Sequence, residues 1–508
     1  MHRTAVVLAS LESSAVIGIE ATPVHIEVDL CFGLPRFQLV GLPDTSVKES
    51  RDRVHAAIRN SGFEFPQHRI VINMAPADVR KAGAAFDLPI ALGVLAASGV
   101  VRDRDIRDVI IVGELALDGT IHPARGVLPI AVAARQQHAA ALLLPAANAA
   151  EAGVVDGLRL LPAKTLTEAV ECLNRDRHEW PLPSSPPSPD AGRAPEANLD
   201  LADLRGQAFA RRALEVAAAG GHNLLLIGPP GAGKTMLARR LPTILPPLGF
   251  DEALEATAIH SVAGLIPPGG SLLAERPFRA PHHTASDAAL VGGGSHPRPG
   301  EVSLAHHGVL FLDEMPEFER RVLDALRQPL EEGRIAVSRA ARSVVFPARF
   351  MLVAAMNPCP CGYLGHATRA CRCTPQQVAR YGARLSGPLR DRLDLVVEVE
   401  PVPIAALSGG PRSETSAVVR ARVLAARDRQ IARQGCLNAR LAARALHGFG
   451  DIAHAARTLL ERSAERLQLS ARAYHRVLRV ARTIADLQNA ERIADASVAE
   501  ALQYRFVA

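Results

Sequence analysis

The sequence predicts a multidomain α/β protein with a parallel sheet in its central part and an all-helical carboxyl-terminal part. Its 508 residues exceed what one hydrophobic core usually takes, so we expect two or three domains. Residues 199–402 alternate apolar strand-like runs with helix-like segments, which favours a parallel sheet. Residues 412–508 show only helical periodicity, and Ser470 is a suitable N-cap for a long helix there.

The composition is typical of a globular protein, with 48% hydrophobic and 22% charged residues. The formal charge of +6 permits nucleic-acid binding without requiring it. Glu12 and Glu20 interrupt the apolar run near the amino terminus, so we expect no secretory signal. No stretch has the roughly 18 apolar residues that a membrane span needs, and we therefore expect a cytoplasmic protein without membrane contact.

Four parts follow one another along the chain. Residues 1–172 alternate short strands, predicted at 70–73 and 109–112, with helices predicted at 86–97 and 127–134. Residues 173–198 are rich in Pro and Ser, the composition of an extended linker. Residues 199–402 form the predicted sheet-containing core, and residues 412–508 form the predicted helical domain.

A phosphate-binding loop is predicted directly after the apolar strand 223–227. Residues 228–235 fit the pattern Gly-x-x-x-x-Gly-Lys-Ser/Thr and run into a helix-like stretch. The glycines let backbone N–H groups turn inward around phosphates, and the helix N-terminus adds a favourable dipole. Lys234 would reach the β- and γ-phosphates of ATP, and the Thr235 hydroxyl would bind Mg²⁺. The nucleotide-binding residues expected in this loop are Gly228, Pro229, Pro230, Gly231, Ala232, Gly233, Lys234 and Thr235.

Three further polar side chains end apolar strands of the same core. Asp313 and Glu314 follow the apolar run 309–312, at the carboxyl end of a strand, where ligands bind in open α/β sheets. We expect Asp313 to hold Mg²⁺ and Glu314 to polarise the attacking water. Asn357 follows the strand 350–356 and is expected to position that water, with a simple turn Asn before Pro358 as the alternative.

These motifs, with the helical end, resemble an AAA+ ATPase. The resemblance implies a P-loop ATPase core with a carboxyl-terminal helical lid, and it places the start of the adenine pocket at Gly206 and Gln207. Residues 386–394 resemble the arginine-finger segment of the magnesium-chelatase and MCM branch, with the finger on Arg392. Such a finger stabilises the phosphoryl group held by the next subunit. The alternative is a surface arginine paired with Asp391 or Asp394.

The segment 470–474 resembles the sensor-2 helix of that branch, with Arg472 as the γ-phosphate contact and Arg476 as the competitor. A finger that acts on a neighbour requires a ring, so the resemblance implies a homo-oligomer, and a hexamer is the expected form.

Four of the seven cysteines lie close together, in two Cys-x-Cys pairs. Four thiolates so placed would close a tetrahedral structural zinc site that braces the loop after Asn357. Four free or partly buried thiols are the alternative. The expected zinc ligands are Cys359, Cys361, Cys371 and Cys373.

Three segments are candidates for substrate contact. The first is 279–298, between the two nucleotide motifs. The second, 334–346, is predicted to be a hairpin with Arg339 and Arg342 near its tip, where they would contact DNA phosphates. A solvated hairpin without such a role is the alternative. The third is the arginine-rich last helix bundle, where Arg472, Arg476, Arg479 and Arg482 fall largely off the apolar face.

The amino-terminal part resembles the Lon protease domain in residues 77–91 and 111–123. That protease uses a Ser–Lys dyad, and the matching positions here are Ala85 and Leu128. Without a nucleophile and a base the covalent chemistry cannot run. We therefore expect an α+β Lon-like domain at 1–172 that is proteolytically inactive and serves assembly or binding.

Over nearly the whole chain the sequence resembles the YifB/ComM family, the magnesium chelatase-like proteins. Residues 28–35, 40–44, 278–284 and 357–362 carry that resemblance. It implies a hexameric, Mg²⁺- and ATP-dependent DNA helicase for branch migration in recombination and natural transformation, with single-stranded or branched DNA as partner. The alternatives are a protein-remodelling AAA+ chaperone, a magnesium-chelatase motor subunit and, against Ala85 and Leu128, an active protease.

Overall fold

The computed structural model describes residues 7–505 except 43, 45, 46, 48, 79, 80, 82, 104, 185–198, 295, 296, 340, 341, 367, 403–413, 443 and 446–451. The chain forms two compact units: Met1–Arg193 with Ala253–Ala274, and Ala194–Glu252 with Glu275–Ala508. The second unit holds both nucleotide motifs and all the helices after residue 414. None of the described helices is both long and apolar enough to cross a membrane.

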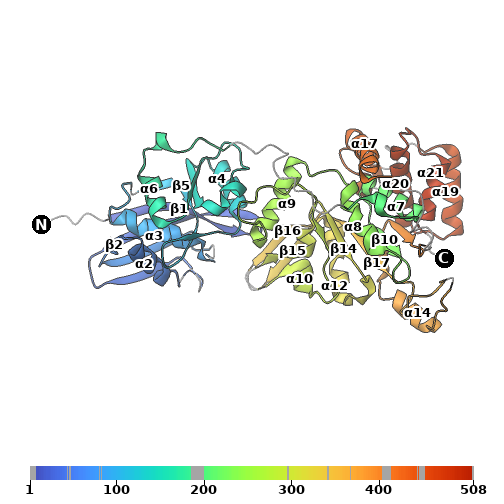
Figure 1. The fold of residues 1–508 in the computed structure, drawn as a ribbon, viewed down its shortest axis with the longest axis horizontal. Helices are drawn as coiled ribbons and strands as arrows, with labels where there is room; N and C mark the ends of the chain where they lie inside the picture. The colour runs from blue at the N-terminus through green and yellow to red at the C-terminus, as the bar shows by residue number, and fades with distance from the viewer. Residues whose placement is uncertain are drawn as a thin grey trace. The chain divides into compact units, whose positions relative to one another are not determined.

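The first unit is a seven-stranded mixed sheet in the order β3-β4-β2-β1-β5-β8-β9 (Figure 1). Its strands are β1 (Val7–Ile17), β2 (Glu20–Cys31), β3 (Arg36–Val40), β4 (Arg69–Ala75), β5 (Asp105–Ile111), β8 (Ala141–Pro145) and β9 (Leu160–Ala163), with a small ribbon of β6 (Glu114–Leu115) and β7 (Ile121–His122). Its helices are α2 (Ser50–Asn60), α3 (Asp87–Ala97), α4 (Val127–Gln136), α5 (Ala149–Ala152) and α6 (Leu166–Asn174). The two strands and two helices predicted in this part are confirmed.

Alternation along the strands gives this sheet two buried faces. Val109 and Ile111 of β5 pack in the cluster with α2, α3 and α6, whereas Ile110 packs in the cluster with α4 and α5. Successive side chains of a strand point to opposite faces, so a run such as 109–112 must be apolar throughout when helices cover both faces.

The second unit is built on a five-stranded sheet in the order β11-β14-β17-β10-β18, with every neighbouring pair parallel. The strands are β10 (Leu224–Ile227), β11 (Phe278–Arg279), β14 (Val309–Leu312), β17 (Met351–Met356) and β18 (Leu395–Glu398). Flanking helices are α7 (Ala208–Gly220), α8 (Lys234–Ile244), α10 (Asp287–Val291), α11 (Glu301–Leu304), α12 (Arg320–Ala325), α13 (Arg327–Glu332), α14 (Pro375–Gly382) and α15 (Gly387–Arg390). The mixed α/β class with a parallel-sheet core is confirmed.

Two antiparallel ribbons leave the sheet: β12 (Gly292–Gly293) with β13 (Arg298–Pro299), and β15 (Arg334–Arg339) with β16 (Arg342–Pro347). The predicted hairpin at 334–346 is thus confirmed. Helix α9 (Phe250–Ala263) begins in the second unit and continues in the first.

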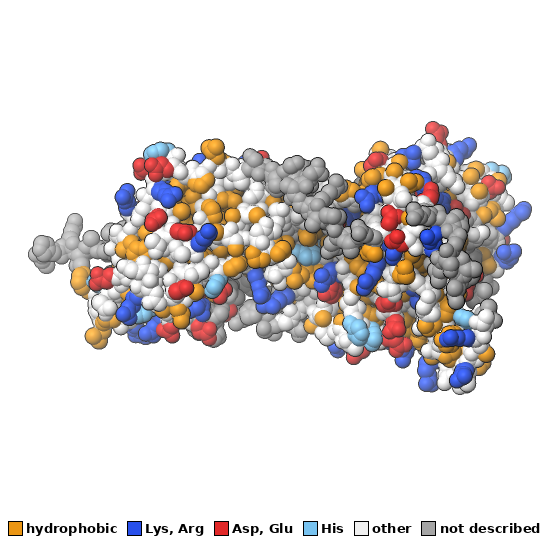
Figure 2. All heavy atoms as spheres, viewed as in Figure 1, with side chains coloured by type: hydrophobic (Ala, Val, Ile, Leu, Met, Phe, Trp, Pro, Cys, Tyr) orange, Lys and Arg blue, Asp and Glu red, His pale blue; other side chains and the backbone are white. Residues whose placement is uncertain are grey.

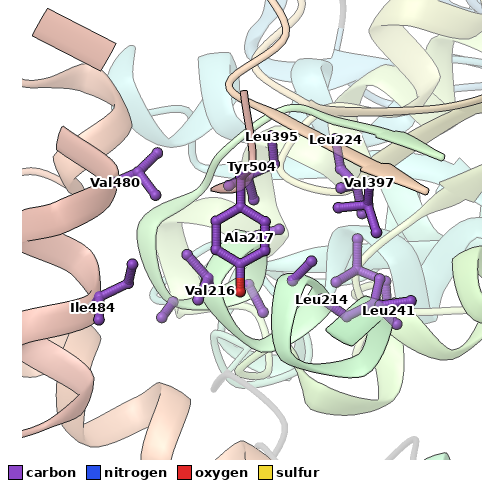
Figure 3. Packing of buried hydrophobic residues seen from close by; sticks show 14 of the residues in the cluster. Leu214, Val216, Ala217, Leu224, Leu241, Leu395, Val397, Val480, Ile484 and Tyr504 are labelled. Atoms are coloured by element: carbon purple, nitrogen blue, oxygen red, sulfur yellow. The ribbon is translucent and has the colours of Figure 1, made fainter. Parts of the chain in front are cut away.

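The carboxyl-terminal helices are α17 (Ser416–Gln434), α19 (His454–Arg466), α20 (Ala471–Leu487) and α21 (Asp495–Gln503), with a 3₁₀ turn η6 (Asn438–Arg440). The Ser470 hydroxyl accepts a hydrogen bond from the Ala473 N–H, which confirms the predicted N-cap. Figure 3 shows how these helices join the sheet: Tyr504 lies among Ile484 of α20, Leu214 of α7 and Leu395 of β18. This shared apolar cluster makes lid and sheet one hydrophobic core.

Candidate functional site

The phosphate-loop segment connects β10 to α8 in a conformation that needs its glycines. Gly231 and Gly233 have φ of 77° and 87°, in the left-handed region that favours glycine. A Cβ on Gly228 would lie 2.3 Å from the Val399 carbonyl oxygen, so only glycine fits there. Residues 228–233 therefore form a tight turn that ends where α8 begins at Lys234.

Lys234 is the most buried charged group of this turn, with 9% of its surface exposed. Its Nζ donates to the carbonyl oxygens of Gly228 (2.6 Å) and Pro229 (3.0 Å) and to Asn357 Oδ1 (3.0 Å). Burial lowers the pKa of Lys234, and the negative charges of Asp313 and Glu314 oppose that shift. The structure thus brings together Lys234 and Asn357, which the sequence placed in one site.

Thr235 and Asp313 face each other across the sheet edge. The Thr235 Oγ1 donates to Asp313 Oδ2 at 2.7 Å, and the Glu314 N–H donates to Asp313 Oδ1 at 3.0 Å. A hydroxyl and a carboxylate with hard oxygen donors at this spacing fit Mg²⁺, which prefers one or two carboxylates together with phosphate oxygens. Both residues would hold the ion, which neutralises phosphate charge when bound.

Glu314 departs from regular geometry, with a φ of 50°, in the left-handed region. Such a backbone costs on the order of 1 kcal/mol in a non-glycine residue and is typical of active sites. Its carboxylate lies 3.7 Å from the His283 Nδ1, and the His283 ring also contacts Phe318. The sequence singled out 279–298 for substrate contact and missed that His283 lies beside Glu314, because the parallel pairing of β11 with β14 leaves no signal within either segment.

Gln207 links the phosphate loop to a second cavity. Its Nε2 donates to the carbonyl oxygens of Ala232 (2.5 Å) and Glu400 (3.1 Å). Gly206, Gln207 and Phe209 line a cavity of about 500 Å³ together with residues that follow β18. A base would fit this space while its phosphates extend to the loop, the arrangement expected for Gly206 and Gln207.

The predicted arginines Arg392 and Arg472 lie near the amino ends of the parallel strands, whereas the phosphate loop lies at their carboxyl ends. Arg392 and Arg472 line one cavity of about 490 Å³, with Asn223, Phe350 and Asp394 in its wall. Those three wall residues directly precede β10, β17 and β18, whereas Gly228 and Asn357 directly follow β10 and β17. Because the strands are parallel, the two sites are separated by the span from Asn223 to Gly228, roughly 16 Å for five steps of about 3.3 Å each.

Two arginines of this cavity lack full partners. Arg392 contacts Glu331 and donates to the Pro388 carbonyl at 2.6 Å, and its Nε is buried without a hydrogen-bond partner among the described residues. Arg476 lies 3.7 Å from Asp394, and its Nη1 is likewise buried and unpaired within the described part of the chain. Arg472, one turn earlier on α20, is exposed. Both candidates for the sensor-2 role therefore line the same cavity as Arg392.

The sequence predicted that the arginines of α20 lie off the apolar face of the helix, but two of them are buried. Arg482 is 1% exposed and binds Asp486 and the carbonyl oxygens of Ala490 and Glu491. Arg476 is 8% exposed. The prediction was wrong for these two because a buried carboxylate, Asp486, gives Arg482 a partner inside the bundle, which periodicity cannot show.

The four cysteines form a compact cluster. The Sγ atoms of Cys359, Cys361 and Cys371 lie 3.4–3.6 Å apart, and all four ligand atoms, with that of Cys373, lie within 4.8 Å of one another. Four sulfurs around a zinc at 2.3 Å would lie ~3.8 Å apart, so the cluster fits the ion. Hydrogen bonds from the backbone N–H groups of Arg372 and Tyr363 lower the pKa of Cys361 to about 6, which favours a thiolate.

The cysteine segment also abuts the phosphate loop. A Cβ on Gly362, which follows Cys361, would lie 2.5 Å from the Pro230 Cδ. Asn357 at the start of the segment accepts the Lys234 hydrogen bond. The cysteine segment therefore contacts the phosphate loop at two points, through Gly362 and through Asn357.

The DNA-contact candidates are placed only by their backbone. Arg339 and Arg342 close the β15–β16 hairpin as its last pair, and their side chains lie outside the described part of the structure. Basic and acidic side chains are interspersed over the described surface of each unit in Figure 2. The charge distribution of that face does not by itself mark a nucleic-acid path.

In the amino-terminal unit, Ala85 lies in the 3₁₀ turn before α3, and Leu128 is fully buried in α4. The Leu128 N–H donates to Glu151 Oε1 at 3.0 Å. Neither side chain has a nucleophile or a base.

Comparisons with known proteins match the whole chain. Family models described as magnesium chelatase subunit ChlI match residues 200–407 and 26–148, and its carboxyl-terminal region matches 413–505. Competence protein ComM of Haemophilus influenzae is 48% identical over 98% of this chain and 97% of its own. The protein YifB of Escherichia coli is 46% identical over 98% and 97%. The magnesium-chelatase 38 kDa subunit of Rhodobacter capsulatus is 29% identical over 27% and 43%.

Proposed function

The chain belongs to the YifB/ComM family of magnesium chelatase-like proteins, and from this premise we propose that it is an ATP-driven DNA motor. The observation that carries the ATPase part is the convergence of Lys234, Thr235, Asp313 and Asn357 at one sheet edge. DNA is proposed as the substrate because one relative, matched over 97% of its length, is a competence protein.

The proposed reaction is hydrolysis of ATP at the γ-phosphate. Lys234 and the loop N–H groups bind the β- and γ-phosphates, and Glu314 accepts a proton from the attacking water. Asn357, fixed by its bond to Lys234, orients that water. The bond from the γ-phosphorus to the bridging oxygen breaks, and ADP and phosphate leave. Thr235 and Asp313 hold the Mg²⁺ that offsets the negative charge.

Arg392 is proposed to complete the site of a neighbouring subunit. It lies at the amino ends of the parallel strands, roughly 16 Å from its own loop by the span from Asn223 to Gly228. Among the described residues, Arg392 Nε and Arg476 Nη1 are buried without a hydrogen-bond partner, so these side chains would turn outward to meet a neighbour's phosphate. Arg472 and Arg476, on the same cavity, are proposed to approach the neighbour's γ-phosphate as well. A closed ring, proposed to be a hexamer, supplies every loop with these arginines.

The role of the other parts follows from their residues. We propose that residues 1–172 form a Lon-like domain that is inactive as a protease, because Ala85 and Leu128 carry no reactive group. The linker expected at 173–198 is proposed to begin after Trp180, because α6 runs to Asn174 and Trp180 is buried in the core of the first unit. Residues 199–402 without Ala253–Ala274 are proposed as ATPase core and 412–508 as lid. The four cysteines are proposed to hold a structural zinc that braces the phosphate loop.

The test is the steady-state ATPase rate with and without single-stranded, duplex and four-way-junction DNA, at two salt concentrations. A phosphate-tracking motor is stimulated by DNA, and the stimulation fades as salt rises. Lys234→Ala removes the turnover and serves as the background control. Healthy basal turnover without response to any DNA would overturn the DNA assignment and favour a protein-remodelling ATPase, in which the β15–β16 hairpin contacts polypeptide.

A further inference from the structure

A second arginine-lined cavity lies between the lid and the core of the second unit, away from the phosphate loop. It has a volume of about 350 Å³ and is lined by Arg276 and Arg349 from the core and by Arg427 and Arg440 from the lid. Arg427 belongs to α17, and Arg440 ends the 3₁₀ turn η6. The cavity is large enough for a small phosphate compound or a short stretch of backbone phosphates.

The charges around this cavity are not balanced. Four arginines face two carboxylates, Glu252 and Asp428, so the lining has a formal charge of +2 (four minus two). Glu252 is already paired with Arg276 at 2.6 Å. Among the residues that the structure describes, Arg349, Arg427 and Arg440 form no ion pair with a carboxylate within 4 Å, although burial lowers the pKa of both Arg427 and Arg440 and the charge of Glu252 opposes that shift. An unpaired group of like charges is unfavourable unless an anion joins it.

Arg427 is the residue that distinguishes this cavity. Its Nε donates to the Ala218 carbonyl at 2.8 Å, which fixes the guanidinium of a lid helix against the end of α7. Burial lowers the pKa of Arg427, the positive charges of Arg276 and Arg440 add to that shift, and the charge of Glu252 opposes it. A bound phosphate would reverse that penalty through charge-assisted hydrogen bonds.

This cavity and the cavity lined by Arg392 and Arg472 share part of their walls, but each also has arginines of its own. Arg349 and Arg440 line both cavities, whereas Arg427 lines only this one, and Arg392 and Arg472 line only the other. Substitutions at Arg427 and Arg472 therefore report on the two cavities independently.

We propose that the cavity around Arg427 is a second phosphate-binding site, distinct from the ATP site, which takes an oligophosphate or a nucleic-acid phosphodiester and ties the lid to the core. An anion held there contacts Arg427 and Arg440 on the lid side and Arg349 on the core side. An anion bound in this way stabilises the packing of the carboxyl-terminal helices on the core by mass action.

The experiment uses full-length Lys234→Ala protein, in which the phosphate loop no longer holds a nucleotide tightly, titrated with tripolyphosphate in a calorimeter and followed by thermal melting. Binding and a rise in melting temperature are expected. Adding Arg427→Gln should weaken binding at least about tenfold, the loss of a charged hydrogen-bonded contact. Arg429→Gln is the matched control, because Arg429 on the same helix also donates to one backbone carbonyl, that of Asp486, and does not line the cavity.

Three outcomes would overturn the proposal: no tripolyphosphate binding once Lys234 is replaced, equal effects of Arg427→Gln and Arg429→Gln, or a loss that follows Arg472→Gln instead. Arg427→Lys is the control for misfolding of the Arg427→Gln protein. It keeps the positive charge and should retain most of the tripolyphosphate binding. A twenty-nucleotide oligothymidylate then identifies the source. If it displaces tripolyphosphate in an Arg427-dependent way, the ligand is nucleic-acid backbone; if it does not, the ligand is a soluble oligophosphate.

Discussion

Lys234 must satisfy two opposing demands at the scale of a single residue. It has to carry a positive charge to bind phosphates, and it sits in a turn that leaves 9% of it exposed. Burial lowers its pKa, while the nearby carboxylates of Asp313 and Glu314 limit the shift. Two loop carbonyls and the Asn357 side chain accept hydrogen bonds from the Lys234 ammonium and keep it oriented.

This arrangement predicts that ATP binding takes up a proton at alkaline pH. The free protein has a lowered lysine pKa, so Lys234 loses its proton at a lower pH than an ordinary lysine. Bound phosphates, being negative, raise that pKa again, and the difference must be filled from solvent. Proton uptake should be near zero at neutral pH and increase as pH rises. Calorimetry in buffers of different ionisation enthalpy measures it, and Lys234→Ala should show none; a constant uptake over the whole range would contradict the prediction.

Among single elements, the lid helix α20 depends on one buried carboxylate. Asp486 is 1% exposed and accepts hydrogen bonds from Arg433 (2.7 Å), Arg482 (3.1 Å) and Asn438 (2.8 Å). Asp486 thus joins α20 to Arg433 of α17 and to Asn438 of η6.

Asp486→Ala is predicted to destabilise the lid by about 3–5 kcal/mol, because two arginines lose their buried partner at once. Chemical denaturation followed by circular dichroism measures the change in unfolding free energy. Glu465→Ala, an exposed acid on α19, is the matched control and should stay within about 0.5 kcal/mol of the parent. A loss as small as that of the control would show that solvent reaches this cluster.

The cysteine segment predicts a link between a metal and nucleotide affinity. Cys371→Ser should lower the zinc content from about one ion per chain and weaken ATP binding by about tenfold, ~1.4 kcal/mol, because Gly362 rests against Pro230. Metal analysis and nucleotide titration measure both quantities. Cys172→Ser, in α6 of the other unit, should change neither. Protein purified without zinc that binds ATP normally would refute the assignment.

Elements with strong local signals could be predicted from the sequence. A few adjacent residues are enough to predict the apolar strand before Gly228, the N-cap at Ser470 and the β15–β16 hairpin. Long-range relations could not be. That His283 lies beside Glu314 depends on strand order, and that Arg482 is buried depends on Asp486 four residues later accepting it inside the bundle. The grouping of Ala253–Ala274 with the first unit has no local signature either.

For the whole molecule, the separation of Arg392 from Lys234 predicts complementation between subunits. Arg392→Ala and Lys234→Ala proteins should each be inactive, and their mixture should recover part of the ATP turnover at interfaces that pair an intact loop with an intact arginine. Steady-state turnover across mixing ratios measures it, with native gels to verify mixed assemblies. No recovery at any ratio in verified mixed assemblies would place the arginine's action within its own chain.

The opposite placement of loop and arginines on the sheet also has a consequence for enzyme concentration. In the proposed ring the two surfaces that meet differ from each other, so an open row of subunits would always end with one loop that no arginine reaches. A solitary subunit has only such a loop. Under this proposal the specific ATPase activity depends on assembly. Dilution below the dissociation constant of the assembly would abolish ATP turnover although each chain stays folded.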